Sequence, residues 1–180
     1  MNNFFLIGTF FLLSCSNNPE LVKEFIVEKD LPIEVIKHAD MIHTENGIIK
    51  VSIKATKIER FLTPDARLIF SEGLNVHFFN DSSVLQSILT AERAVINEQN
   101  KIMQASSKVV LENTEGKKLQ TEELFWDEKK ELIFTEKKVT ITTDKEVIYG
   151  EGLTSNPDFS VYTLKKVHGK INYLATEIKN

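Results

Sequence analysis

The sequence predicts an all-β protein, and three observations carry that prediction. After residue 32, apolar and polar residues alternate in short runs, which is the period of a strand with one buried face. Turn-forming clusters such as Asn46-Gly47 separate these runs. A unit of 23 residues also repeats at an offset of 30 residues. No stretch in this region combines a helical period with both helix caps.

The repeat occupies Leu89–Leu111 and Leu119–Ile141, and a looser copy follows at 148–171. Leu89 aligns with Leu119, and Ile96 aligns with Trp126. Periods of this size indicate stacked supersecondary units, none of which buries its apolar face alone. We therefore expect Ile96 and Trp126 to occupy equivalent places in neighbouring units.

The strands are predicted in chain order. Residues 40–44 and 48–55 form a hairpin, because Asn46-Gly47 adopts the positive φ angles of a type I′ turn. Strands at 67–71 and 74–79 are separated by a break at Glu72-Gly73. Further turns are predicted at 63–66, 80–83, 97–100, 113–116, 127–130 and 144–145. We expect roughly 12–16 short antiparallel strands in one curved or folded-over sheet that encloses their apolar faces.

Composition and residue spacing narrow the range of possible functions. The chain has 180 residues, enough for one domain with its own core, and a net charge of −4 with no basic run, which argues against a nucleic-acid groove. A single cysteine excludes an intrachain disulfide. The four histidines lack the spacing of a zinc site, and no nucleophile or nucleotide-binding motif is present. We expect no catalysis, metal or cofactor.

The N-terminus predicts membrane targeting. The apolar run Phe4–Leu13 has ten residues, whereas a membrane-spanning helix needs about 20, so residues 1–14 fit a signal peptide. Leu12-Leu13-Ser14-Cys15 resembles a bacterial lipobox, which makes Cys15 the lipid anchor. The alternative is an ordinary signal peptide with an incidental cysteine. Residues 15–32 follow as anchor and tether, 33–173 as the β domain and 174–180 as a tail; residues 20–29 fit a short helix or an extended arm.

Three stretches resemble the LptC family in order and spacing: FSEGLNVHFFN at 70–80, VVLENTEGKKLQTEELFWD at 109–127 and IYGEGLTSNPDF at 148–159. The resemblance covers about residues 35–171. It implies a single twisted, half-open β-jelly roll of the OstA/LptA-like superfamily. One difference concerns the N-terminus, because well-known members carry a transmembrane helix where this chain has the lipobox.

The resemblance also implies a function without catalysis. The protein would be a component of the lipopolysaccharide transport bridge, accepting lipopolysaccharide from an inner-membrane ABC transporter and passing it to LptA. It would sit at the periplasmic face of the inner membrane of a Gram-negative bacterium, lipid-anchored through Cys15. The alternatives are an LptA-like bridge protein and a structural or adhesive β-solenoid surface lipoprotein.

Candidate binding residues follow from the strand faces and the resemblance together. The side chains expected to line a lumen for lipopolysaccharide acyl chains are Val51, Ile53, Phe70, Val76, Phe78, Ile96, Val109, Leu111, Leu124, Trp126, Val139 and Ile141. The alternative is that they pack a closed core. The N-terminal edge of the sheet is expected to face the ABC-transporter permease. The C-terminal edge, expected to bind an LptA-like protein, carries Tyr162, Leu164, Ile171 and Tyr173.

Overall fold

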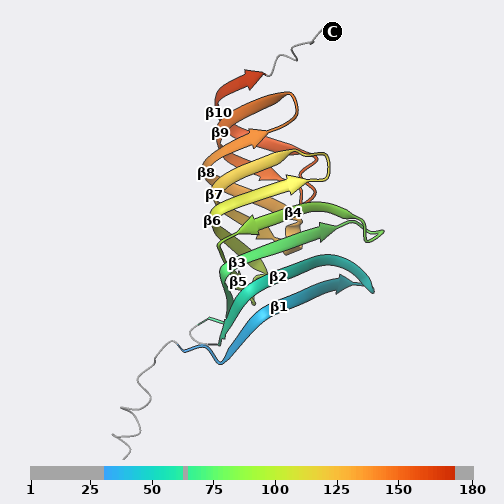
Figure 1. The fold of residues 1–180 in the computed structure, drawn as a ribbon, viewed down its shortest axis with the longest axis vertical. Coiled ribbons are helices and arrows are strands. Elements are labelled where there is room, and N and C mark those ends of the chain that lie inside the picture. The colour runs from blue at the N-terminus through green and yellow to red at the C-terminus, as the bar shows by residue number, and fades with distance from the viewer. Residues whose placement is uncertain (1–30, 63–64, 173–180) are drawn as a thin grey trace, which may run out of the picture. The chain divides into compact units, whose positions relative to one another are not determined.

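The computed structural model describes residues 31–62 and 65–172, in which the chain forms one antiparallel sheet of ten strands (Figure 1). The strands are β1 (Glu34–Glu45), β2 (Ile48–Phe61), β3 (Arg67–Phe79), β4 (Leu85–Ala91), β5 (Arg93–Asn97), β6 (Ile102–Asn113), β7 (Lys118–Asp127), β8 (Leu132–Thr142), β9 (Glu146–Ser155) and β10 (Tyr162–Asn172). A short 3₁₀ helix, η1 (Glu128–Lys130), follows β7. The predicted all-β jelly roll is confirmed.

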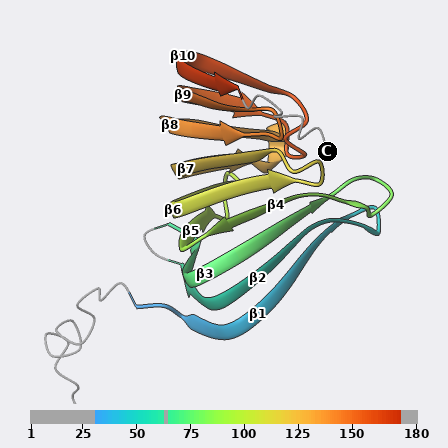
Figure 2. The ribbon, with the colours of Figure 1, turned by 45° about the horizontal axis from the view of Figure 1, so that its top comes forward.

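The strands stack in chain order, with one exception. The order in the sheet is β1-β2-β3-β4-β6-β7-β8-β9-β10, and β5 pairs with β3 and β6 beside that path (Figures 1 and 2). β4 and β5 are therefore two halves of one rung, interrupted at Glu92. The Glu92 carbonyl accepts a hydrogen bond from Gly73 N, and its N–H donates to the Ser107 carbonyl. These two hydrogen bonds fix the backbone of Glu92 between β3 and β6.

The sheet is bent across its long strands, so that the two halves of each strand lie in facing layers. Layer A contains residues 39–45, 48–55, 74–79, 85–91, 109–113, 118–121, 139–142, 146–150 and 167–172. Layer B contains residues 34–37, 57–61, 67–71, 93–97, 102–106, 123–127, 132–135, 153–155 and 162–164. Between the halves the pairing register shifts, as it does at β-bulges, which bend strands and increase their twist.

Positive φ angles mark the bend. Glu72, Gly73, Ser107, Lys108 and Gly152 all have φ between 52° and 97° in the middle of their strands. The expected break at Glu72-Gly73 is thus a bulge through which β3 continues. This continuity also explains why the structure has ten strands rather than roughly 12–16, since hydrogen bonding runs through bends where the sequence predicts strand ends.

Cross-strand rows of apolar side chains fill the space between the layers. One row in layer A crosses eight strands through directly paired residues: Met41, Ile53, Val76, Leu89, Leu111, Leu119, Ile141 and Ile148. The five from Val76 to Ile141 are at most 2% exposed. Both layers contribute to one core cluster, because each strand has only one apolar face to bury.

The 30-residue repeat corresponds to a step of two strands. Leu89 and Leu119 lie in the same row of layer A, with Leu111 between them. In layer B, Ile96 and Trp126 each pair with Met103 from opposite sides. The expected equivalence of Ile96 and Trp126 is therefore confirmed as a shared row.

Asparagine side chains form the predicted turns. Asn46 and Gly47 have φ of 51° and 80°, as a type I′ hairpin requires. Asn113 Oδ1 accepts hydrogen bonds from the N–H groups of Glu115 and Lys117, and Asn97 and Asn80 cap their own turns in the same way. These side chains replace the ladder partners that the backbone loses at each turn.

Leu111→Ala should destabilise the fold by about 2–5 kcal/mol, because the side chain is fully buried in the layer A row. Its neighbour Val110 points to the outer face and is only half-buried, so Val110→Ala should cost under about 1 kcal/mol. Urea unfolding followed by circular dichroism measures both values. Equal losses would mean that the inner row does not carry the stability of the sheet.

Candidate functional site

A cavity of about 450 Å³ opens where the turns of layer A face the turns of layer B. Its lining combines residues of both layers: His43, Glu45, Lys50, Val51, Phe78, Phe79, Asn80, Asp81, Ser82, Gln86, Trp126, Glu128, Glu131, Asn156, Pro157 and Asp158. We call this opening the mouth. It lies on the side of the sheet opposite the bend, since these residues flank hairpin turns rather than bulges.

The floor of the mouth is apolar. Val51 on β2 pairs directly with Phe78 on β3, and the Phe78 ring meets the Trp126 ring edge-on at a centroid distance of 5.1 Å. Phe78 belongs to layer A and Trp126 to layer B, so this aromatic contact joins the layers. Both side chains are less than 10% exposed, but they still border the cavity. An apolar chain that passes the polar rim meets aromatic surface at this floor.

The rim of the mouth is polar and partly bridged. His43 Nε2 on β1 lies 3.5 Å from Glu128 Oε1 on η1, which brings the two layers together across the opening. The same nitrogen lies 3.7 Å from Glu45 Oε1. Lys50 pairs with Asp81, and this hydrogen bond raises the pKa of Lys50 and lowers that of Asp81. Both rim pairs are at least partly exposed to water and contribute little to stability.

The charge of the rim is mainly negative. Glu45, Asp81, Glu128, Glu131 and Asp158 line it, opposed by one lysine and one histidine among the lining residues. Such a rim offers no cluster of cations for a phosphate group. Apolar contact with the floor is therefore what this site offers a ligand.

The η1 turn positions the layer B side of the mouth. Asp127 caps η1, since its carboxylate accepts a hydrogen bond from Lys130 N, and Lys130 Nζ lies 2.9 Å from Asp127 Oδ2. These contacts, with the Lys130 side chain first, lower the pKa of Asp127. The capped turn holds Asp127 in place, and its two neighbours therefore take fixed positions, with Trp126 on the floor and Glu128 on the rim.

The twelve predicted lumen residues all belong to the space between the layers. Eleven are buried in the core cluster, and Ile96 is partly buried against it. Only Val51, Phe78 and Trp126 border the mouth. The other nine pack against neighbouring side chains in the form described. Their role in holding a ligand remains a prediction and would require the layers to move apart.

Sequence reasoning did not identify the rim or the loop beside it. His43, Glu128 and the loop at 156–161 are far apart in sequence, and only the bend brings them to one opening. Asn156-Pro157-Asp158 carries a turn signal, but nothing local predicts which strand the turn would meet. The rim is a product of long-range pairing.

The two edges of the sheet are β1 and β10. Among the residues described, β1 pairs only with β2, and β10 only with β9. Val35 and Ile42 on β1 are 49% and 60% exposed. Strands with unpaired backbone groups and exposed apolar side chains are templates for a further strand.

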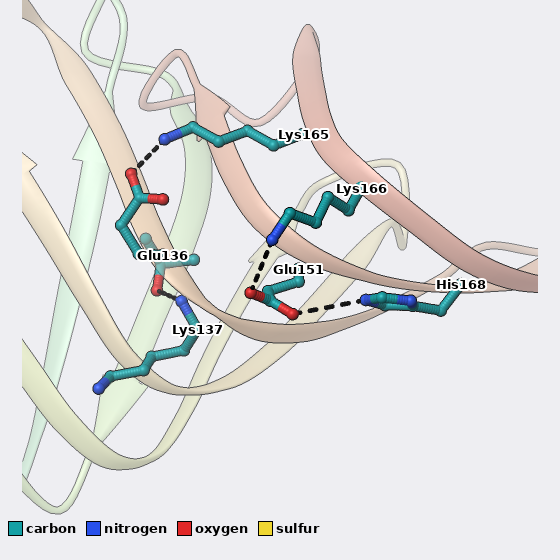
Figure 3. Close-up of polar contacts among 7 residues, drawn as sticks. Glu136, Lys137, Glu151, Lys165, Lys166 and His168 are labelled. Atoms are coloured by element: carbon teal, nitrogen blue, oxygen red, sulfur yellow. Dashed lines mark hydrogen bonds and ion pairs between the residues drawn. The ribbon is translucent and has the colours of Figure 1, made fainter.

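Lysines on β10 are bound to carboxylates of inner strands. Figure 3 shows Lys165 paired with Glu136, and Glu151 bridging Lys166 and His168. Lys166 first, and then His168, lowers the pKa of Glu151. The contacts span β8 to β10 and tie the edge strand to the sheet through side chains as well as backbone.

The predicted partner residues on β10 face different ways. Tyr162 and Leu164 pack against the core, and burial raises the pKa of Tyr162. Ile171 is 54% exposed and available to another strand. Tyr173 and Cys15 lie outside the described residues. In residues 31–62 and 65–172, no helix is long and apolar enough to cross a membrane, and no three metal-binding side chains converge.

A comparison with models of known protein families gives a match. The family model described as LptC: Lipopolysaccharide-assembly, LptC-related matches residues 4–172, which is nearly the whole chain. No curated protein matches the sequence.

Proposed function

The chain belongs to the LptC-related family of lipopolysaccharide assembly, whose role in lipopolysaccharide transport is not enzymatic, and from this premise we propose that its jelly roll carries acyl chains between the two layers. In this proposal the protein accepts lipopolysaccharide from an inner-membrane ABC transporter and passes it to an LptA-like protein. The family places it at the periplasmic side, tied to the inner membrane of Gram-negative bacteria.

The apolar floor of the mouth is the observation that supports this proposal most directly. Phe78 and Trp126 come from different layers and are continuous with the buried rows behind them. Each methylene group moved from water onto such a surface contributes about 0.8 kcal/mol. Saccharide and phosphate groups would remain in water, because the acidic rim has no set of cations to bind them.

Entry would begin at the mouth and continue by separation of the layers. Apart from the strand bends, the contacts that join the layers at the opening are side-chain contacts, such as Phe78 with Trp126 and His43 with Glu128. An acyl chain inserted there would replace apolar contacts between the two layers with apolar contacts to the acyl chain itself. Core burial is thereby retained while the layers move apart.

A photo-reactive amino acid at Phe78 should capture lipopolysaccharide in cells, and one at Leu124 should do so more weakly, because Leu124 is packed behind the floor. The matched control is Lys108, which lies on the bend with an 80% exposed side chain. Adducts are measured by immunoblotting for lipopolysaccharide on the purified protein. Capture at Lys108 alone would overturn the proposed lumen.

The edges of the sheet are proposed to bind the neighbouring components. β1 would face the transporter permease and β10 the LptA-like protein, so that the sheet continues from one protein to the next. Support comes from the unpaired strands and from the exposed Val35, Ile42 and Ile171. The inward Tyr162 and Leu164 would continue the apolar face rather than contact the partner's outer surface.

Gly150→Ala should weaken binding of the LptA-like protein, because an added Cβ would lie 2.8 Å from the Lys166 carbonyl oxygen and push β10 away from β9. Gly169→Ala is the control in the same strand pair, since its Cβ would meet only Tyr149, at 3.9 Å. Co-purification with the tagged partner measures the effect. Equal recovery with both variants, each folded by circular dichroism, would contradict a partner site at β10.

Cys15 is proposed to carry the lipid anchor. Metabolic labelling with a palmitate analogue should mark the wild-type protein and not Cys15→Ala, and the variant should move to the soluble periplasmic fraction. Replacement of Ser16 by alanine is the control, because it leaves the cysteine intact. Unlabelled wild-type protein would favour an ordinary signal peptide with an incidental cysteine.

A further inference from the structure

The loop between β9 and β10 closes part of the opening between the layers. Residues 156–161, which we call the latch, follow Ser155 at the end of layer B. The latch is folded on itself: Asn156 Oδ1 accepts a hydrogen bond from Val161 N, and Asn156 Nδ2 donates to Ser160 Oγ. It is therefore a compact unit rather than an open connection.

Two side chains fasten the latch to layer A. Ser87 Oγ on β4 donates a hydrogen bond to the Pro157 carbonyl at 2.5 Å. Lys117, in the turn between β6 and β7, donates from Nζ to the carbonyls of Phe159 and Ser160 at 3.3 and 3.1 Å. These contacts join segments 43 and 70 residues apart in sequence and bridge the two layers.

Phe159 is the part of the latch that enters the core. Its side chain is 0% exposed, and its ring lies 5.4 Å from that of Tyr162 and 5.6 Å from Lys117 Nζ. Its φ of 54° is in the left-handed region, which a bulky residue adopts only when its surroundings hold it there. The burial of the Phe159 ring and its contacts with Lys117 stabilise this conformation.

The latch also forms a wall of the mouth. Asn156, Pro157 and Asp158 line the cavity, whereas the next residue, Phe159, is part of the core cluster. On the layer A side the mouth borders β1 to β4, and on the layer B side it borders the end of β7 and η1. The inner rows continue to Ile148 on β9 and Leu164 on β10. A chain moving from the mouth toward the C-terminal edge meets the latch on its way.

We propose that the latch is a gate, with Phe159 as its plug and Lys117 as its fastener, that separates acyl-chain entry at the mouth from passage to the C-terminal edge. This rests on the proposed transport function and adds a controlled step to it. When the gate opens, an acyl chain takes the place of the Phe159 ring, so the core stays filled. The left-handed backbone of Phe159 relaxes as the ring leaves, which favours opening once a ligand is present.

The test uses the purified full chain and two photo-reactive reporters, one at Val51 in the mouth and one at Ile148 near the C-terminal edge. Lipopolysaccharide is added, and its capture at each position is measured. Fluorescence of Trp126, the only tryptophan, reports binding at the mouth independently. When the latch has its wild-type sequence, capture of lipopolysaccharide at the Val51 reporter should exceed capture at the Ile148 reporter.

Lys117→Met removes the ammonium group but keeps the aliphatic stem, and it should raise the Ile148-to-Val51 capture ratio about tenfold, the effect of losing a charged hydrogen bond. Lys118→Met is the matched control. Lys118 pairs with Glu112 at 3.0 Å and does not contact the latch, so the ratio should stay unchanged. A closed gate is obtained with Lys117→Cys and Ser160→Cys joined by a cleavable bis-maleimide. Capture at Ile148 should then disappear and return when the linker is cut.

The outcomes separate the two proposals. If the wild-type protein gives neither a Trp126 change nor capture at Val51, the proposed transport function fails. If binding at the mouth is intact but the capture ratio is the same in the Lys117→Met, linked and wild-type proteins, the gate is overturned. The linked variant keeps the test decisive even if Lys117→Met does not fold.

Discussion

The burial of one apolar face per strand is the constraint on which this structure depends. A flat sheet of ten strands would leave that face in water, and the described residues contain no α-helix to cover it. The sheet instead covers itself by bending at bulges such as those at Gly73 and Ser107. The bend creates the core, brings Phe78 to Trp126 and leaves an opening along the opposite side. Stability and the candidate binding surface therefore have the same origin.

This shared origin makes the inner rows suitable for a transport protein. The rows contain few polar atoms, so the free energy of contact changes little when one apolar group replaces another. The exposed ion pairs across the opening are individually weak, as between His43 and Glu128. The bend, by contrast, is made of continuous backbone. Opening along one side is easier than unfolding for a sheet joined in this way.

Local sequence signals predicted the strands and turns well. Asn46-Gly47 marks its hairpin because few other dipeptides accept two positive φ angles. The sequence alignment of Leu89 with Leu119 reflects a step of two strands, since both residues pair with Leu111. The positions of the bends were harder to predict from the sequence, because Ser107 and Lys108 adopt positive φ angles although neither is glycine and both resemble ordinary strand residues. The loop that carries Phe159 was missed because its contacts with Ser87 and Lys117 depend on the whole sheet. The sequence therefore predicted which residues are buried, but not which of them reach an opening.

The two-strand repeat has an evolutionary consequence. Because one unit of 30 residues returns the chain to the same row, loss or duplication of a unit changes neither the inner face nor the identity of the edge strands. The space between the two layers would shorten or lengthen by two strand spacings, about 10 Å. A chain that gained or lost one unit would change by two strands while β1 and β10 keep their neighbours. Selection on the distance between two binding partners can act on the number of repeats without redesigning either interface.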